Sequence, residues 1–434
     1  MKSPTLDQPL AATLGDAAVR QQDTTTGFLD GLLRRNLLRR LNALRHGQLT
    51  LVDTDGGRWV FGDLQATLRA EVHVHAPALW RMLAARGAIG AGEAYVLGHW
   101  SSPDLTSVMR VLVANLDVLD GLERGPVRLG KPLLQGLHWL NRNTRDGSRR
   151  NIAAHYDLGN ALFERFLDPS MMYSAAVFDA ADDTLALAQR NKLARICRKL
   201  ELKSTDHLLE IGTGWGGMAI HAAQRHGCRV TTTTLSKEQY DTACARVAAA
   251  GLEDRVTVLL EDYRDLSGQY DKLVSIEMIE AVGHRYLPTY FHQCASLLKP
   301  DGLMLLQAIT IRDQRYARAR RSVDFIQKYI FPGGALPSVS RMADVVASAT
   351  DMTIHHMEDI GLHYARTLRL WRENLRHARE ELAPLGYDER FFRMWQYYFC
   401  YCEGGFMERH IGTAQLLLAK PGARPVYPGA FAEA

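Results

Sequence analysis

The stretch that decides the fold is LLEIGTGWGG at residues 208–217, an apolar run that ends in closely spaced glycines. It predicts a buried strand over His207–Gly212 and a helix over Gly216–His226. Glycines at positions 212, 214 and 216 allow a tight turn and let the backbone approach a ligand closely, where side chains would collide. The stretch therefore predicts a ligand-binding strand–turn–helix unit, with a plain strand-to-helix turn as the alternative.

Downstream of this stretch, short apolar runs alternate with longer segments of helical periodicity. Strands are predicted over Arg229–Thr234, Val256–Leu260, Lys272–Glu277 and Leu303–Ile311, and helices over Lys237–Ala250 and Tyr286–Leu298. Alternation of this kind is typical of an α/β fold with a doubly wound, mostly parallel sheet.

Upstream, the pattern indicates a smaller α+β domain over residues 26–120. Hairpin-like runs separated by glycine turns fill Leu49 to Val74, and helical spacing returns over Ala78–Arg86 and Pro103–Leu119. We expect a disordered leader over residues 1–25, a connector over 121–150 and the larger domain over 151–434.

Composition is that of a globular protein with two domains. Of the 434 residues, 47% are hydrophobic and 23% are charged, so there is ample material for a core. The six cysteines lack the spacing of a disulfide framework or zinc site, which predicts free thiols and no metal. No secretory signal and no membrane-spanning run is evident, so we expect a cytoplasmic protein whose membrane contacts are peripheral.

The residues around the glycines indicate which ligand they bind. A dinucleotide site has G-x-G-x-x-G and an acidic residue at the end of the second strand. Here the glycine spacing is tighter, and the second strand runs into Thr234-Leu-Ser-Lys-Glu-Gln239. Acidic residues occur instead at Glu210 and at Asp262, after the third strand. This combination favours a nucleoside with a sulfonium amino-acid tail over a pyrophosphate.

Several sequence blocks in order carry a more specific resemblance. They include NIAAHYDLGNALFERFLDPSMMYSAAVF, LLEIGTGWGG, TLSKEQ, DYRDL, SIEMIEAVGH, FIQKYIFPGG, HYARTLRLW and YYFCYCEGGF, between Asn151 and about Pro421. The chain resembles the cyclopropane-fatty-acyl-phospholipid synthase family, which includes the mycolic acid cyclopropane synthases. The resemblance implies a Rossmann-like class I methyltransferase domain and S-adenosylmethionine as cofactor. It also implies transfer of a methyl(ene) group to the cis double bond of unsaturated phospholipid acyl chains.

The same resemblance assigns the residues of the cofactor site. They are Tyr173, Ser174, Glu210, Gly212, Gly214, Trp215, Gly216, Thr234, Leu235, Gln239, Asp262 and Tyr263. It places Gln239 on the ribose, and it has Asp262 accept from the adenine amino group with Tyr263 packed beside the ring.

In this family a bound bicarbonate is thought to remove the proton that allows ring closure. The resemblance assigns its ligands to Glu280, Tyr364 and the carbonyl at Ile309. The family's cysteine position is Ala175 here, and its histidine position is Gln307. Bicarbonate binding and ring closure are therefore predicted to be altered, with a methyl-branched or methylene product as the alternative to a cyclopropane.

Other candidate residues keep two interpretations. Cys402 matches a cysteine noted in the family, and it is either a packing residue or a reactive thiol. Glu280, without the resemblance, is equally a solvated carboxylate at a helix start. The aromatic run from Phe391 to Tyr401 forms either a core or an acyl tunnel that stabilises a cation.

The helix predicted over Leu32–Leu44 is basic and amphipathic. Arg34, Arg35, Arg39 and Arg40 are expected to contact lipid phosphates, unless the helix packs on its own domain. The predicted partners are membrane phospholipids, not nucleic acid, and a homodimer stays open. A non-catalytic lipid-binding protein is the rival function from another class, and a small-molecule methyltransferase would leave the N-terminal domain unexplained.

Overall fold

The computed structural model describes residues 28–122 and 159–426, which form two compact units. Of the described residues, the first unit contains 28–122, 324–330 and 376–408. The second contains 159–323, 331–375 and 409–426. The predicted leader and nearly all of the predicted connector lie outside the described residues.

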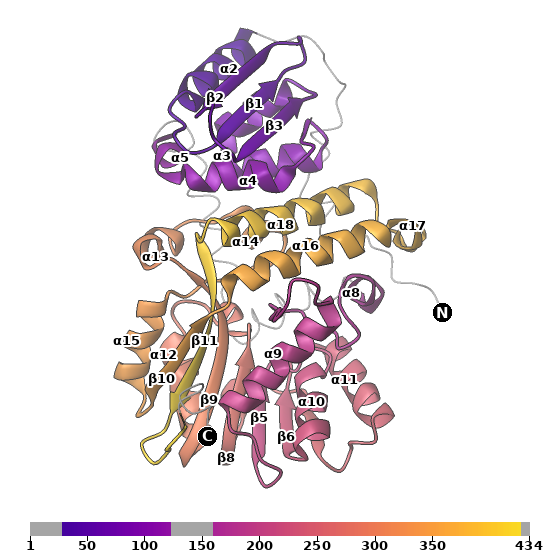
Figure 1. The fold of residues 1–434 in the computed structure, drawn as a ribbon, viewed down its shortest axis with the longest axis vertical. Coiled ribbons are helices and arrows are strands. Elements are labelled where there is room, and N and C mark those ends of the chain that lie inside the picture. Colours follow the sequence, from indigo (N-terminus) through magenta and orange to yellow (C-terminus); the bar gives the residue numbers. More distant parts are fainter. Residues whose placement is uncertain (1–27, 123–158, 427–434) are drawn as a thin grey trace. The chain divides into compact units, whose positions relative to one another are not determined.

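The first unit is built on a four-stranded sheet in the order β2-β1-β3-β4. Its strands are β1 (Gln48–Val52), β2 (Arg58–Gly62), β3 (Arg69–Val74) and β4 (Trp100–Ser101). β1 and β2 form the antiparallel hairpin that the turn residues predicted, and β3 pairs with β1 in parallel. Figure 1 shows this sheet with its helices, which confirms an α+β arrangement.

Helices from three parts of the sequence complete the first unit. They are α2 (Phe28–Leu41), α3 (Ala78–Val96), α4 (Leu105–Ala114), α5 (Leu116–Leu122), α14 (Phe325–Tyr329), α17 (Arg379–Leu382) and α18 (Glu389–Met407), with the short 3-10 helix η5 (Ala383–Leu385). α3 runs beyond the predicted Arg86 because Gly87, at a φ of 55°, kinks the helix without ending it. α18 packs on α3 and α4.

Buried polar contacts fix the late segments in the first unit. Glu93 on α3 is 1% exposed and accepts from Lys328 Nζ at 2.7 Å and from the Tyr329 hydroxyl. Thr106 on α4 donates to the buried Glu403 of α18 at 2.9 Å. The compact units therefore differ from the predicted division, which assigned 324–330 and 376–408 to the larger domain. Such long-range contacts leave no local signal in the sequence.

The predicted membrane-facing helix is α2, and one of its arginines faces its own domain. Arg34 forms ion pairs with Asp53 at 2.7 Å and Asp55 at 2.9 Å, and its guanidinium lies 4.7 Å from the centre of the Trp59 ring. Arg35, Arg39 and Arg40 are exposed. Arg34 thus packs on its own domain, and contact of the exposed arginines with lipid stays a prediction.

The second unit contains a seven-stranded sheet in the order β10-β11-β9-β8-β5-β6-β7. Its strands are β5 (His207–Ile211), β6 (Arg229–Thr233), β7 (Val256–Leu259), β8 (Tyr270–Ile276), β9 (Leu298–Ile311), β10 (Thr353–Asp359) and β11 (Ile411–Ala419). The five strands β5 to β9 pair in parallel. β11 pairs antiparallel with β9 on one side and with β10 on the other. The mostly parallel sheet is confirmed, whereas β10 and β11 were not predicted.

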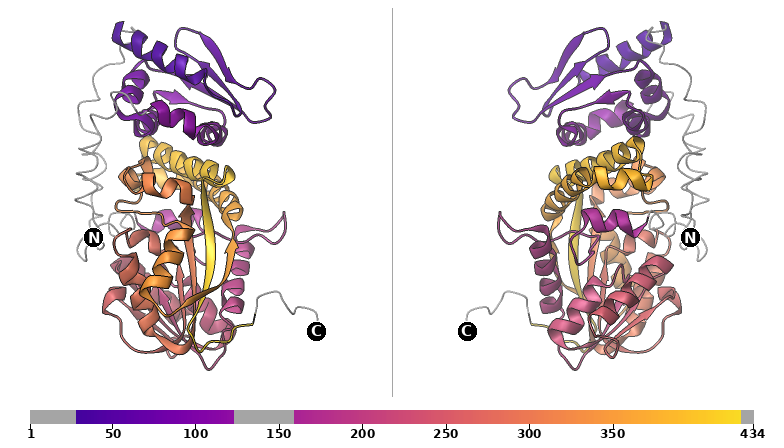
Figure 2. Two further views of the ribbon diagram at one scale, coloured as in Figure 1. Left: turned by 90° about the vertical axis from the view of Figure 1, so that its left-hand side faces the viewer. Right: turned by 90° about the vertical axis from the view of Figure 1, so that its right-hand side faces the viewer.

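Helices cover both faces of this sheet (Figure 2). The helices of the second unit are α8 (Asn160–Phe166), α9 (Leu185–Lys199), α10 (Gly217–His226), α11 (Lys237–Ala249), α12 (Leu287–Leu297), α13 (Asp313–Ala319), α15 (Val339–Ala349) and α16 (Gly361–His377), with the 3-10 helices η3 (Tyr263–Asp265) and η4 (Ile279–Ala281). Successive strand residues alternate between faces. Leu208 and Leu305 pack in one core with α9 and α10, while Leu209 and Leu306 pack in the other with α12 and α15.

The cysteines and the helices of the described residues bear on two further expectations. All six cysteines are free, as predicted. None of the helices in 28–122 and 159–426 is both long and apolar enough to cross a membrane.

Candidate active site

The glycine-rich turn lies where β5 ends and α10 begins. Gly212, Gly214 and Gly216 have φ values of 103°, 53° and 86°, a region that favours glycine. The Gly212 amide donates to the Thr233 carbonyl of β6 at 3.1 Å, which holds the turn against the neighbouring strand. A Cβ at Gly214 would meet no atom of the described chain within 4 Å, so this side of the turn is open to a ligand.

Glu210, near the end of β5, is a buried carboxylate suited to a cation. It is 2% exposed and accepts from the Thr232 hydroxyl at 2.7 Å. Burial raises the pKa of Glu210 to about 8, although the Thr232 hydrogen bond opposes the shift. An ammonium group bound beside it would offset this desolvation.

The loop after β6 brings together three predicted cofactor residues. The Thr234 hydroxyl donates to the amide oxygen of Gln239 at 2.8 Å, and both residues are buried. Ser236 caps α11 by accepting from the Gln239 amide nitrogen at 3.3 Å. Leu235 lies between them and is half-buried.

After β7, Asp262 is buried at 2% exposure and forms an ion pair with Arg264. Arg264 Nη2 lies 2.6 Å from Asp262 Oδ2, and Nε lies 2.8 Å from Oδ1. The Tyr263 ring packs edge-on against Tyr290 at 5.4 Å. A carboxylate has room for further donors beside an arginine, so the contact with adenine stays a prediction.

Tyr173 and Ser174 precede α9, and Ser174 contacts a lysine that the sequence did not single out. Lys192 is fully buried, and its Nζ donates to Ser174 Oγ at 2.7 Å. Burial lowers the pKa of Lys192 to about 8, while the charges of Glu277, Asp168 and Glu210 oppose this. The carboxylates of this site therefore have a positive charge beside them.

The Trp215 side chain packs against α8 and holds the turn in position. Its ring lies 4.8 Å from Phe163, and its indole N–H donates to Asn160 at 2.8 Å. Arg246 donates to the Trp215 carbonyl at 2.9 Å and to the Ser170 carbonyl at 3.1 Å, which ties the turn to the segment before Tyr173.

A second cluster forms where β8 ends, around a carboxylate that the sequence analysis did not assign. Glu277 Oε1 accepts from Gln307 Nε2 at 2.8 Å and from the Ala175 backbone N–H at 3.0 Å. Glu277 Oε2 accepts from the Tyr364 hydroxyl at 2.8 Å. The structure thus brings Gln307, Tyr364 and Ala175 together around Glu277, and their predicted contact with bicarbonate stays a prediction.

Glu280 lies one 3-10 turn further on, in η4. Its Oε1 accepts from the Ile309 backbone N–H, so the contact with Ile309 is to the amide and not to the carbonyl. Its Oε2 is buried without a hydrogen-bond partner in the part of the chain that the structure describes. Burial, followed by the charge of Glu277, raises the pKa of Glu280 to about 8. A cationic group would therefore be favoured here.

Several aromatic rings gather around Tyr173, which precedes Ser174 and Ala175 in the chain. The Tyr173 ring has its centre 5.4 Å from Phe163, 5.1 Å from Trp371 and 6.2 Å from Phe331. Trp371 also meets Tyr364 edge-on at 5.9 Å. The faces of such rings stabilise a positive charge.

Cys402 belongs to α18 in the first unit and is not part of this cluster. Burial, together with the charge of Asp324, raises the pKa of the Cys402 thiol well above its usual range. The aromatic run of the same helix packs within the first unit, where Tyr397 lies 4.6 Å from Phe325 and 5.6 Å from Tyr95. A packing role is therefore favoured for Cys402 over a reactive thiol.

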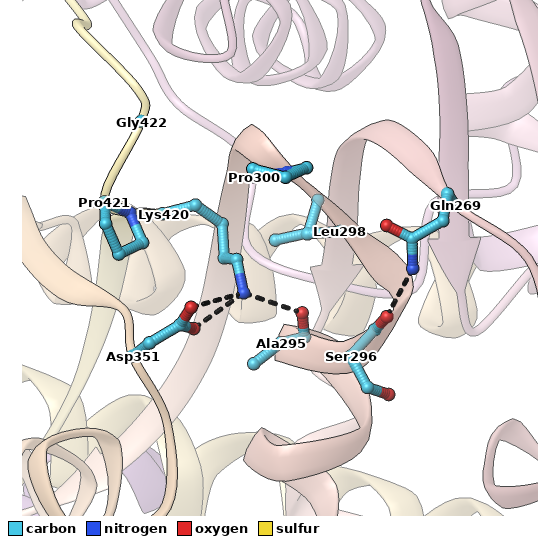
Figure 3. Close-up of a pocket in the computed structure, with 9 residues that line it drawn as sticks. All are labelled: Gln269, Ala295, Ser296, Leu298, Pro300, Asp351, Lys420, Pro421 and Gly422. Carbon is cyan, nitrogen blue, oxygen red and sulfur yellow. Dashed lines mark hydrogen bonds and ion pairs between the residues drawn. The ribbon is translucent and has the colours of Figure 1, made fainter.

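Two other features of the second unit lie away from the site. A pocket lined by Lys420, Asp351 and Pro300 occurs near the start of β9, at the opposite ends of the parallel strands (Figure 3). In it, Lys420 pairs with Asp351 at 2.7 Å. One group with metal-ligand atoms within 4.8 Å of one another, Cys197 with His221 and His226, lies on α9 and α10.

A glycine-rich turn beside a buried carboxylate, with two further carboxylates and several aromatic rings in the same unit, fits a sulfonium nucleoside and an alkene. The family model for mycolic acid cyclopropane synthetase matches residues 143–416. The chain belongs to this family. It is thus an S-adenosylmethionine-dependent enzyme of the methyltransferase and cyclopropane synthase class.

Several relatives match much of the chain. Tuberculostearic acid methyltransferase UfaA1 of Mycobacterium tuberculosis is 42% identical over 409 residues, 90% of this chain and 91% of the relative. Cyclopropane-fatty-acyl-phospholipid synthase of Escherichia coli is 38% identical over 81% of this chain and 88% of the relative. The structure of mycolic acid cyclopropane synthase CmaA1 with SAH and CTAB is similar at a TM-score of 0.59, with 32% identity, and covers 63% of this chain and 98% of that one.

The residues that orient the predicted ones could not be identified from the sequence. Glu277 was visible in the block SIEMIEAVG, but its backbone, at a φ of 51°, is not predictable from its neighbours. Lys192 is one of several basic residues of α9, and residue type alone does not distinguish it from the others. Arg264 follows Asp262 closely, and this spacing was the available signal for their ion pair.

Proposed function

We propose that the protein transfers a methyl group from S-adenosylmethionine to the cis double bond of unsaturated phospholipid acyl chains. The observation that carries the proposal is the pair of carboxylates Glu277 and Glu280 at the end of β8, in the same unit as the cofactor turn. An alkene that attacks a methyl group becomes a carbocation, and the pair offers the negative charge that such an intermediate requires.

The residues of the chain divide this work. Glu210 and the turn at Gly212 and Gly214 would hold the cofactor, which supplies an electrophilic methyl group when bound. The aromatic rings of Tyr173 and Trp371 exclude water and face the developing positive charge. The unpartnered oxygen of Glu280 is free to stabilise the same charge.

We infer that the product is at least partly an open methylene-branched chain. Ala175 and Gln307 differ from the cysteine and histidine of the ring-forming pattern, and one relative of similar length is a tuberculostearic acid methyltransferase. A saturated methyl branch would need an additional hydride donor, whereas a 1,2-hydride shift within the cation, followed by loss of a proton from the methyl group, gives the methylene without one. Cyclopropane formation is the competing outcome.

Lipid analysis tests this function. In a host without such enzymes, expression of the protein should add one CH₂ to the mass of mono-unsaturated phospholipids. Proton NMR of the esters should then show vinylidene signals, because a methylene branch and a ring have equal mass. High-field ring protons alone would contradict the product, and unchanged lipids with retained cofactor binding would support the non-catalytic alternative.

We also propose that exposed arginines of α2 dock the protein on anionic membranes. Arg35, Arg39 and Arg40 are exposed, and Leu32 beside them is 43% exposed. Arg34 is excluded from this surface because it pairs with Asp53 and Asp55. Basic residues around an apolar side chain suit lipid phosphates over an acyl boundary.

Vesicle co-sedimentation tests the docking surface. Changing Arg35, Arg39 and Arg40 to glutamine should weaken binding to anionic vesicles, and salt should weaken wild-type binding, because about 1 kcal/mol is contributed by each basic residue near the surface. The matched control changes three exposed arginines of the second unit, Arg190, Arg198 and Arg229, to glutamine. Equal weakening in both variants would mean that net charge, and not α2, directs binding.

A further inference from the structure

The chain itself fills the position at which the family resemblance puts bicarbonate. The resemblance assigned that anion to the residues at 175, 307, 364, 280 and 309. In the structure, the donors at 175, 307 and 364 all contact the carboxylate of Glu277, at 2.8–3.0 Å. The donor at 309 is taken by Glu280.

These residues do not fit a bound bicarbonate. The Ala175 side chain has no polar atom, and its backbone N–H is already occupied by Glu277. The Tyr364 hydroxyl has one proton to donate, and it faces Glu277 Oε2. A second anion would therefore meet two carboxylates and no unused donor among the described members of this set.

A chain of hydrogen bonds fixes the direction in which Gln307 points. Lys199 Nζ can only donate, and it donates to Gln415 Oε1 at 2.7 Å. The amide nitrogen of Gln415 then faces Gln307 Oε1 at 2.9 Å, which turns the amide nitrogen of Gln307 toward Glu277. Gln307 and Gln415 are fully buried, so this orientation is not exchanged with water.

The backbone also presents Glu277 in a defined way. Its φ of 51° is in the left-handed region, which is costly for a residue with a Cβ. The Glu277 amide donates to the Gln307 carbonyl at 2.7 Å, and this bond holds the strained residue at the end of β8. Strain retained at one residue among convergent donors is typical of a functional position.

We propose that Glu277 is the base that removes the proton from the transferred methyl group, so that the enzyme needs no bicarbonate. The inference rests on the proposed function. In the step, one C–H bond of the new methyl group breaks, and its electron pair forms the third C–C bond of a ring. If a 1,2-hydride shift has first moved the positive charge to the carbon that bears the methyl group, the same pair forms the C=C bond of the methylene instead. The proton passes to the Glu277 carboxylate, and no oxidant or reductant is consumed.

Three hydrogen-bond donors around Glu277 prepare its carboxylate to accept the proton. They orient the carboxylate and leave one lone-pair position of Oε2 available, because Oε2 has only the Tyr364 donor among the described contacts. Glu280 is less suited than Glu277 to remove the proton. Its Oε1 is bound to the Ile309 amide, and its negative charge is needed beside the cation. The two carboxylates therefore have separate tasks.

Anion binding tests, without any lipid, whether Glu277 occupies the position of the bicarbonate. Glu277→Ala should bind formate or bicarbonate in calorimetry, because three donors lose their acceptor, whereas wild type should bind neither. Glu277→Gln is the matched control, because its amide keeps the shape and fills the same space. Bicarbonate binding to wild type at the same affinity as to Glu277→Ala would overturn the proposal.

Turnover on unsaturated phospholipid vesicles tests whether Glu277 is the base that removes the proton. Wild type should be equally active in CO₂-free and bicarbonate buffers. Glu277→Gln should lose roughly 10²–10⁴ in turnover, as expected for a lost general base, while its affinity for S-adenosylmethionine stays within about threefold. Formate should restore part of the activity of Glu277→Ala and none of that of Glu277→Gln.

Isotopic labelling separates a base from a merely structural residue. With a CD₃-labelled cofactor, residual turnover of Glu277→Gln should slow further, because proton removal from the methyl group has become limiting. Wild-type activity that requires bicarbonate, or full activity of Glu277→Gln, would overturn the proposal. If wild type adds no carbon to lipids, the proposed function fails, and the anion-binding comparison still decides the role of Glu277.

Discussion

Glu280→Gln should lower turnover on unsaturated phospholipids by roughly 10²–10³, the range for losing one group aimed at a charge that develops in the transition state. Glutamine keeps the acceptor for the Ile309 amide, so the local structure should persist. Only the negative charge near the cation is removed. Binding of S-adenosylmethionine should therefore be unchanged, and the measurement is kcat with calorimetry of the cofactor.

The pH profile gives an independent check of Glu280. Its pKa is raised to about 8 by burial, so its carboxylate becomes ionised as the pH rises through that value. Wild-type kcat should therefore increase with pH in this range, and the increase should be lost in Glu280→Gln. Glu253→Gln, at an exposed glutamate, is the control for removing a carboxylate elsewhere. Equal profiles for wild type and Glu280→Gln would show that ionisation of Glu280 is not required.

Gly214→Val should abolish most binding of S-adenosylmethionine. A branched side chain at this position would enter the open side of the turn, where the backbone is expected to approach the ligand. We expect affinity to fall by roughly 100-fold, which corresponds to about 2.8 kcal/mol. Calorimetry with the cofactor measures this directly.

Gly251 offers a closely matched control for that substitution. It has a φ of 65° and, like Gly214 with 53°, no atom of the described chain within 4 Å of an added Cβ. Gly251→Val therefore adds the same backbone strain at the end of α11, away from the turn. Similar losses of affinity in both variants would mean that strain, and not a blocked site, explains the effect.

The sequence predicted those parts of the fold that repeat a local pattern. Strand β5 and helix α10 begin and end within a residue or so of their predicted bounds, because apolar periodicity and glycines mark them. Strands β10 and β11 were not predicted. In β10, Ile354 and Met357 are exposed, so its side chains do not show the regular alternation that identifies a strand.

The active site was predictable where a residue type alone suggests a function. Glycines of the turn and Glu210 could be selected in this way, whereas Glu280 was assigned by the family resemblance. Glu277 could not be distinguished from Glu280, since both follow the same strand and only the fold shows which one faces Gln307 and Tyr364. Lys192 required knowledge of which side of α9 is buried.

The first unit is assembled from segments that lie far apart along the chain, and this has a consequence for synthesis. Thr106 and Glu403 are separated by 297 residues, and Arg110 and Glu408 by 298. The ribosome therefore releases α3 and α4 long before α18, whose aromatic side chains complete their packing. Until then their apolar surfaces, including Tyr95, which packs on Tyr397 of α18, need protection from other nascent chains, because exposed surface of this kind promotes aggregation. A C-terminal truncation would thus damage the part of the protein that is synthesised first.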